Sequence, residues 1–166
     1  MLLDRARHAA TVGSLADYTR PGLIVPHLQE RDTPGVVNEL TRILHREGRI
    51  PDVLAFYHAA LNHEFLVNSA MDCGIAVPHA RLNGVAQPSF AFGRAAQPLM
   101  WGPRPSRPVQ FVFLLSVPAT DAAGYLQLLS ALARMGQRDE LLERLRAAPS
   151  GGAIFEVFKE VRLRQG

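Results

Sequence analysis

Apolar residues recur at helical spacing in two segments of the first half of the chain, and each segment follows an aspartate. Asp32-Thr33-Pro34 supplies a capping side chain and then a proline where its missing N–H costs nothing, so a helix is predicted from there to Gly48. Its apolar positions lie three and four residues apart, at Val36, Val37, Leu40, Ile43 and Leu44. A second helix is predicted from Asp52 to about Phe65.

Four short apolar segments have the composition of strands: residues 23–25, 74–79, 88–95 and 109–117. The second of them is closed by Pro78, which favours a strand that enters a fixed turn. The last is apolar at both alternating sets of positions, as expected of a central strand covered on both sides. Residues 102–108 contain three prolines and are predicted to form a loop.

Three more helices are predicted in the last third of the chain. The first is capped by Thr120 or Asp121 and ends at Gly136. Its expected inward-facing residues are Leu126, Leu129, Leu132 and Ala133. The other two span about residues 139–147 and 152–161. Because strands and helices are interleaved, the predicted fold class is an α/β single-domain sandwich with helices on both faces of its sheet. Residues 1–20 are predicted to form an N-terminal arm or a short helix, and residues 21–166 the domain.

Composition and charge exclude several classes of protein. Of the 166 residues, 48% are hydrophobic and 20% are charged, which suits a globular domain. The net charge of +3 comes from scattered arginines, whereas nucleic-acid binding favours a concentrated basic face, so no nucleic-acid partner is predicted. With Cys73 as the only cysteine, an intrachain disulfide and a four-thiolate zinc site are excluded. The longest apolar stretch, residues 111–119, is too short to span a bilayer, and no signal peptide is apparent, so a cytoplasmic protein without membrane insertion is expected.

The familiar catalytic motifs with glycine-rich loops, nucleophile elbows or paired zinc-binding histidines do not occur. Cys73 precedes His79 by six residues, so a Cys/His nucleophile pair is formally open beside the alternative of a small core cysteine. The six histidines lack tight metal-ligand spacing, and no metal site is predicted. His79 follows Pro78 at the exit of a strand, where a neutral imidazole could attack a phosphoryl group, although residue type alone also fits an ordinary loop histidine.

Residues 74–81, Gly-Ile-Ala-Val-Pro-His-Ala-Arg, resemble the G-I/V-A-I/V-P-H-A/G-R/K signature of the IIA domains of the sugar phosphotransferase system, in their fructose–mannitol and nitrogen-regulatory branch. Four further segments resemble family motifs in the right order. They are residues 60–64 (A-L-x-R-E in the family), 98–101 (P-I/L-x-W), 108–115 (an apolar strand) and 126–133 (a leucine-rich helix). The resemblance covers about residues 23–161, most of the chain.

The resemblance implies a mixed sheet between helices and a phosphoryl-carrier function for His79. In such domains the histidine accepts a phosphoryl group from an HPr-like phosphocarrier protein and passes it to a IIB domain, or uses it as a regulatory mark. The ring nitrogen distal to the backbone is expected to be the acceptor, with Nδ1 oriented by a hydrogen bond. No cofactor is implied.

Several positions depart from the family pattern. His63 replaces an arginine and Tyr125 replaces a second histidine, and both usual residues lie near the phosphoryl group in the family. Where the family has S-T-G-I/V-G before the histidine motif, residues 68–72 of this chain are Asn-Ser-Ala-Met-Asp, and Asp72 adds a negative charge. The candidate site is therefore His79 with His63 and Tyr125, and the resemblance implies that Arg81, Ser69 and Asn68 support the phosphoryl group.

Two functions stay open. One is a phosphotransferase component, and the other is a degenerate IIA-like regulatory module that binds a partner protein with weak or absent transfer. Among residues near these motifs, Glu64 is expected to cap or pair within its own helix, and Trp101 to pack at a sheet edge.

Overall fold

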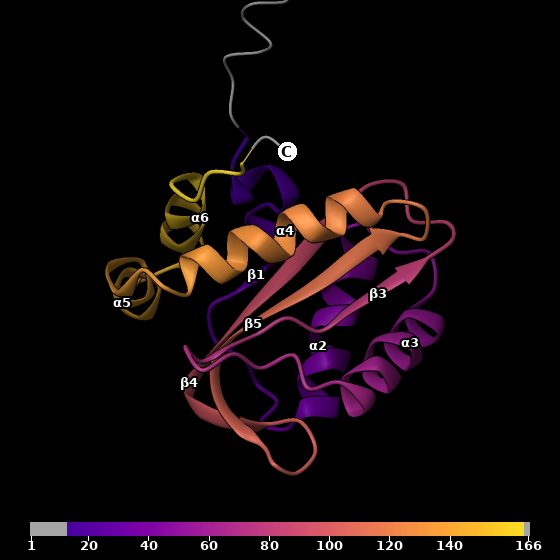
Figure 1. Ribbon diagram of the computed structural model, residues 1–166, viewed down its shortest axis with the longest axis horizontal. Coiled ribbons are helices and arrows are strands. Elements are labelled where there is room, and N and C mark those ends of the chain that lie inside the picture. The colour runs from indigo at the N-terminus through magenta and orange to yellow at the C-terminus, as the bar shows by residue number, and fades with distance from the viewer. Residues whose placement is uncertain (1–12, 165–166) are drawn as a thin grey trace, which may run out of the picture.

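The computed structural model describes residues 13–164, which form a five-stranded mixed sheet covered by helices (Figure 1). The strands are β1 (Ile24–Val25), β2 (Ile75–Ala76), β3 (His79–Leu82), β4 (Ser89–Trp101) and β5 (Arg107–Pro118). Their order is β1-β4-β5-β2, and β3 also pairs with β5. The β4–β5 pair is antiparallel, while β1, β2 and β3 each pair in parallel with their neighbours. The long β5 strand is thus central, as its two-sided apolar pattern predicts.

Helices cover both faces of the sheet, which confirms the predicted α/β sandwich. One face packs against α2 (Thr33–Arg46) and α3 (Val53–Leu66), and the other against α4 (Ala122–Met135), α5 (Asp139–Ala147) and α6 (Gly151–Lys159). Two short 3-10 helices, η1 (Leu15–Tyr18) and η2 (Pro21–Leu23), precede β1. Successive β5 side chains enter opposite cores: Phe111 and Phe113 face the α4 side, whereas Val112 and Leu114 face the α2 side.

Aspartate side chains start three of the helices, as predicted. Asp32 accepts a hydrogen bond from the Gly35 amide at 2.7 Å, and Asp52 accepts one from the Ala55 amide at 3.1 Å. At α4, Asp121 rather than Thr120 is the capping residue. Each cap satisfies an amide that has no partner within its helix, and this is why the predicted and observed starts agree.

The strand bounds differ from the predicted ones in three places. The segment 74–79 is interrupted, because β2 ends at Ala76 and β3 begins only at His79. Pro78 lies in the interruption and has no N–H to donate to a ladder. β4 runs on to Trp101 through a register shift after Arg94, and β5 already begins at Arg107, which shortens the predicted loop.

The inward face of α4 was predicted correctly only in part. Leu132 is buried and Leu129 packs against the core, but the other two predicted residues are not buried. Leu126 is 60% exposed, and Ala133 is also exposed. The buried positions of this helix are Leu128, Ala131, Leu132 and Met135. Leucines occur at positions 126, 128, 129 and 132, so apolar residues surround the helix and helical spacing fits more than one orientation.

Residues 14–18 pack against the last part of the domain. Leu15 is fully buried, and its amide donates to the Val161 carbonyl at 2.9 Å. The Leu163 amide donates to the Gly13 carbonyl at 2.8 Å. Residues 1–12 of the predicted arm lie outside the described residues, and its boundary at residue 20 stays a prediction. No described helix has the length and hydrophobicity needed to cross a membrane.

One arginine is buried in the fold without a carboxylate partner among the described residues. Arg94 of β4 is 8% exposed, and its guanidinium donates to the carbonyls of Pro26 (3.0 Å), Leu145 (2.9 Å) and Ala148 (2.7 Å). Two of these carbonyls lie at the end of α5, where helix carbonyls have no partner in the helix itself. Arg94 therefore joins the central sheet to the α5 end.

Candidate functional site

His79 is the first residue of β3, at the edge of the sheet, and the backbone beside it is held by β5. The Pro78 carbonyl accepts a hydrogen bond from the Leu115 amide of β5 at 2.9 Å. The ring Nδ1 lies 3.3 Å from the Val77 carbonyl oxygen. A carbonyl oxygen can only accept, so this contact assigns the proton of the neutral ring to Nδ1. The lone pair is then on Nε2, the distal nitrogen.

The structure brings His63 and Tyr125 to the two sides of the His79 ring. The ring centroids of His63, from α3, and His79 lie 4.4 Å apart. Those of Tyr125, from α4, and His79 lie 4.5 Å apart. Because α3 and α4 cover opposite faces of the sheet, an edge strand between them is where residues from both helices can meet. These three residues are called the His79 cluster below.

The surroundings of His79 and Tyr125 favour the neutral form of both side chains. Burial is the main cause of a lowered pKa for His79, and the charges of His63 and Arg81 lower it further, against the opposing Val77 hydrogen bond. Burial raises the pKa of the Tyr125 phenol, while the charge of Arg81 opposes that change. At neutral pH the cluster thus contains an unprotonated imidazole, which is nucleophilic, beside a phenol, which is a hydrogen-bond donor.

Arg81 is the fixed positive charge nearest in sequence to His79. It follows His79 by two residues on β3, so both side chains lie on the same face of the strand. Its side chain is exposed, and it forms no ion pair with a carboxylate among residues 13–164. The effect of its charge on the pKa values of His79 and Tyr125 places it within electrostatic range of both.

A buried hydrogen-bond network beneath the cluster centres on Glu64, which is fully buried. Its Oε1 accepts from Trp101 Nε1 at 2.6 Å, from the Ser69 amide at 2.8 Å and from Ser69 Oγ at 3.0 Å. Ser69 Oγ in turn accepts from the Val77 amide at 3.0 Å. The network therefore connects the end of α3 to the residue whose carbonyl orients the His79 ring.

This network differs from the expectation for two residues. Glu64 does not cap or pair within its helix, because its hydrogen bonds reach the following loop and β4. Trp101 is fully buried at the end of β4, as a sheet-edge packing residue is expected to be, and it also donates to Glu64. In the sequence the two residues belong to separate motifs, A-L-N-H-E and P-L-M-W, and no local signal linked them.

Ser69 and Asn68 belong to the loop that supports the cluster, and their described hydrogen bonds are to groups other than His79. Asn68 Oδ1 accepts from the Ala70 amide at 2.9 Å, and Asn68 Nδ2 donates to the Trp101 carbonyl at 3.0 Å. Ser69 is engaged with Glu64 and Val77. Their direct support of a phosphoryl group stays a prediction, whereas their support of the loop is visible.

Asp72 and Cys73 are not part of the His79 cluster. The Asp72 side chain is 97% exposed and pairs with Arg107 at 3.1 Å, so its negative charge has a partner. A Cβ atom added to Gly136, at the end of α4, would lie 2.7 Å from the Cys73 sulfur, which puts this thiol beside that helix end. Within residues 13–164 no group of three His, Cys, Asp or Glu side chains is arranged to hold a metal ion.

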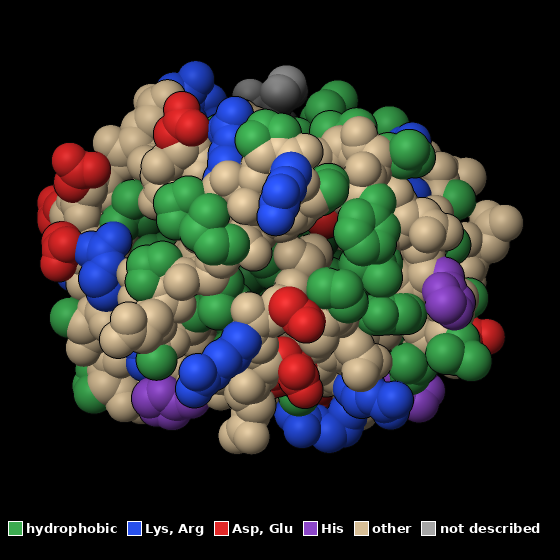
Figure 2. Space-filling model, turned by 90° about the horizontal axis from the view of Figure 1, so that it is seen from below, with side chains coloured by type: hydrophobic (Ala, Val, Ile, Leu, Met, Phe, Trp, Pro, Cys, Tyr) green, Lys and Arg blue, Asp and Glu red, His purple; other side chains and the backbone are tan. Residues whose placement is uncertain are grey.

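The surface near the end of α3 is unusually apolar. Phe65, Leu66 and Val67 are 50%, 83% and 59% exposed, and Met100 of β4 is 60% exposed. Seen from below, the face that carries the β4–β5 hairpin shows hydrophobic side chains gathered in groups between charged ones (Figure 2). Exposed apolar side chains that gather in this way are typical of protein–protein contact surfaces.

Comparison with known proteins relates most of the chain to one family. The family model described as "Phosphoenolpyruvate-dependent sugar phosphotransferase system, EIIA 2" matches residues 17–161. The chain is 31% identical over 127 residues to the fructose-specific EIIA component of Haloferax volcanii, covering 76% of this chain and 82% of that protein. It is 27% identical over 148 residues to a nitrogen regulatory protein of Pseudomonas aeruginosa, covering 89% and 96% of the two chains.

Longer relatives and a solved structure agree with this result. The chain is 29% identical to part of the fructose-specific EIIABC component of Bacillus subtilis, matching over 81% of this chain but only 21% of the length of that protein. The crystal structure of nitrogen regulatory protein IIA-Ntr from Neisseria meningitidis has the same fold, with a TM-score of 0.74 at 22% identity over 87% of this chain and 98% of that one.

Proposed function

Because the chain belongs to the EIIA 2 family of the phosphoenolpyruvate-dependent sugar phosphotransferase system, we propose that it carries a phosphoryl group on Nε2 of His79. The donor in this proposal is an HPr-like phosphocarrier protein. The acceptor is a IIB domain, or else the phosphohistidine itself acts as a regulatory mark. The observation that carries the proposal is the Nδ1 contact with the Val77 carbonyl, which leaves Nε2 as the free nucleophile.

The proposed step is an in-line displacement at phosphorus. The Nε2 lone pair of His79 forms the new N–P bond while the N–P bond of the donor phosphohistidine breaks, and the donor ring keeps that electron pair. The Nδ1 proton stays on His79, where the Val77 carbonyl stabilises the positive charge that the ring acquires. Such transfers depend mainly on positioning and charge stabilisation. The buried Glu64 network supplies positioning by holding Ser69 and, through it, Val77.

Charge stabilisation comes from three side chains in this proposal. Arg81 supplies the permanent positive charge, and Tyr125 supplies a hydroxyl donor from the α4 side. His63 supplies one N–H donor from the α3 side. An arginine at position 63 would add a second permanent positive charge next to the His79 ring. With His63 there instead, we expect the phosphoryl transfer to be slower.

A protein is a better-suited phosphoryl donor than a small molecule at this site. The exposed side chains of Phe65, Leu66, Val67 and Met100 offer an apolar area on which a carrier protein can dock. Fructose-specific and nitrogen regulatory proteins both occur among the relatives, which supports both onward transfer and a regulatory use of the phosphohistidine.

The proposal is tested by intact-mass measurement after incubation with phosphoenolpyruvate, enzyme I and HPr, with the sample kept alkaline because phosphohistidine is acid-labile. We expect one added phosphoryl group in the parent protein and none in His79→Ala. The matched control is His58→Ala, an exposed histidine of α3 outside the cluster, which should be labelled like the parent. Labelling of His79→Ala would place the acceptor elsewhere. No labelling of the parent by HPr or by a nitrogen-branch carrier would contradict the carrier function.

A further inference from the structure

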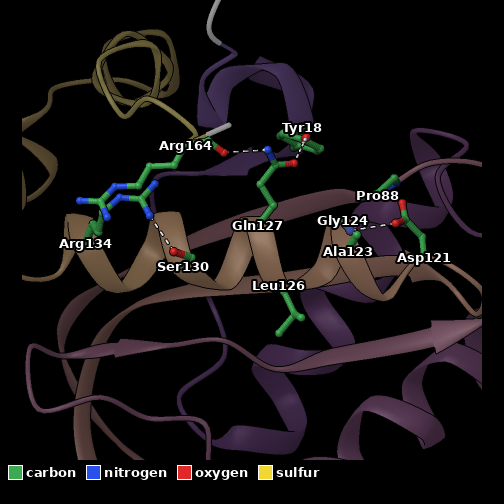
Figure 3. Close-up of a pocket in the computed structure, with 10 residues that line it drawn as sticks. All are labelled: Tyr18, Pro88, Asp121, Ala123, Gly124, Leu126, Gln127, Ser130, Arg134 and Arg164. Atoms are coloured by element: carbon green, nitrogen blue, oxygen red, sulfur yellow. Dashed lines mark hydrogen bonds between the residues drawn. The ribbon is translucent and has the colours of Figure 1, made fainter. Parts of the chain in front are cut away.

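An open groove of about 770 Å³ runs along α4, and Arg164, close to the C-terminus, borders one end of it (Figure 3). Residues from η1, from the start of α4 and from its last turns line it. None of its lining residues belongs to the His79 cluster. Its volume lies in the range of small-molecule sites, which is about 300–1,000 Å³. The groove therefore needs an explanation separate from the proposed phosphoryl site.

One end of the groove carries two arginines. Arg134 and Arg164 lie at this end, while the only carboxylate of the lining, Asp121, lies at the opposite end and accepts from the Gly124 amide at 2.8 Å (Figure 3). Arg134 donates to Ser130 Oγ at 2.6 Å and to the Arg162 carbonyl at 3.2 Å. Neither arginine forms an ion pair with a carboxylate of residues 13–164, so the remaining N–H donors of both guanidinium groups are available.

More positive charge adjoins this end. A second hollow shares Arg134 with the groove and is also lined by Arg138 and Arg162. The carboxylate in that hollow, Glu160, is already paired with Arg144. Charges of one sign that line a concave surface raise the local potential and concentrate ions of the opposite sign. The arginine end of the groove is thus suited to an anion.

The groove has a fixed floor. The Tyr18 hydroxyl donates to Gln127 Oε1 at 3.3 Å, and Gln127 Nε2 donates to the Arg164 carbonyl at 3.2 Å. These bonds hold the backbone of Arg164 against α4, and the hydrogen bond from Arg134 to the Arg162 carbonyl holds the same segment. The Arg134 guanidinium and the Arg164 backbone are thus already positioned, and positioning before binding lowers the entropy lost when a ligand binds.

Away from the arginines, the groove is lined in part by apolar side chains. Leu126, 60% exposed, lies midway along α4, and Pro88 and Ala123 lie at the end that carries Asp121 (Figure 3). We propose that the groove binds a small organic phosphate ester. Arg134 and Arg164 hold the phosphate, and the apolar or aromatic body of the ligand lies along α4 toward Leu126. Two guanidinium forks match a phosphate dianion in charge and in geometry, because each can donate two parallel hydrogen bonds.

Amide NMR spectra of the ¹⁵N-labelled protein, titrated with phenyl phosphate, test the proposal. We expect shifts of the Gln127 and Ser130 amides, with phenol and inorganic phosphate each binding more weakly than phenyl phosphate. Replacing both arginines (Arg134→Gln, Arg164→Gln) should weaken binding about tenfold or more, because charge-assisted hydrogen bonds are lost. Arg42→Gln, an exposed arginine of α2, is the matched control and should leave the affinity unchanged.

Several results would overturn the proposal. They are an absence of α4 shifts at millimolar phenyl phosphate, an unchanged affinity in the double variant, and equal affinity for inorganic phosphate. Tighter binding of a hexaglutamate peptide at the same amides would overturn it in favour of an acidic protein segment. The His79→Ala variant should bind phenyl phosphate at the groove like the parent, so failure here and failure of the proposed phosphoryl transfer are distinguishable.

Discussion

Replacing Glu64 with alanine should destabilise the domain more than any exposed substitution on the same helix. The Glu64 carboxylate is fully buried, and its Oε1 accepts three hydrogen bonds, from Trp101 Nε1 and from the amide and hydroxyl of Ser69. Alanine removes the acceptor from all three donors at once. Trp101 is itself fully buried, so its indole N–H loses its partner without access to water.

The expected cost follows from these contacts. A buried donor left without a partner costs about 1–3 kcal/mol, and the Ser69 groups, which are half-buried, add a smaller amount. Relief of the carboxylate desolvation offsets part of this loss, because Glu64 Oε2 has no partner among the described residues. The net loss in unfolding free energy should be about 2–4 kcal/mol. Glu64→Gln keeps an acceptor at Oε1 and should cost only about 1 kcal/mol, because it loses charge but no hydrogen bond.

Urea unfolding followed by far-ultraviolet circular dichroism measures these differences. Glu156→Ala is the control. Within residues 13–164 that exposed glutamate pairs with Lys159 alone, so the change in unfolding free energy should be less than about 0.5 kcal/mol. The reasoning is refuted if Glu64→Ala loses less than about 1 kcal/mol, or if Glu64→Gln loses as much as Glu64→Ala. Either result would mean that the network does not hold the loop that orients His79.

Four further predictions follow from individual side chains. Arg94→Met should lower the unfolding free energy by about 2–4 kcal/mol in urea titrations, because carbonyls at the α5 end lose their buried donor. Burial lowers the pKa of His79 in the folded protein below 6.5, the value of a free histidine. The folded state therefore becomes less stable relative to the unfolded state as the pH falls below 6.5, because the unfolded state binds the proton more readily. Between about pH 7.5 and about pH 5, the unfolding free energy of His79→Gln should therefore fall by less than that of the parent. Tyr125→His should raise the rate of phosphorylation, by up to about tenfold, and an unchanged rate would show that Tyr125 only packs. His63→Arg should raise it similarly, and a lower rate would show that His63 has a role of its own.

Local signals in the sequence were sufficient for most of the helices and for the order of the elements. Asp32 and Asp52 cap their helices as expected, because a capping aspartate acts on an amide three residues away. The bounds of α5 agree with the predicted residues 139–147. Proximity of His63, His79 and Tyr125 was implied only through the family resemblance, since these residues lie on three separate elements.

Features that depend on long-range packing could not be predicted in the same way. The rotation of α4 about its axis is decided by the core against which Leu128 and Leu132 pack. Because α4 has leucines on several of its faces, the sequence alone does not show which face is buried. The role of Glu64 depends on the Trp101 indole, 37 residues away, which no local pattern connects to it. By strand alternation Arg94 shares the face of Phe90 and Phe92, but only the fold shows that the α5 carbonyls surround its guanidinium.

The central claim is that His79 accepts a phosphoryl group on its distal ring nitrogen. Long-range ¹H–¹⁵N correlation spectra of the phosphorylated, ¹⁵N-labelled protein test this claim most directly, because they distinguish the two nitrogens of each imidazole ring. The account predicts a phosphorylated Nε2 on His79, with Nδ1 still protonated against the Val77 carbonyl. A phosphoryl group on Nδ1 of His79, or on any other residue, would contradict it.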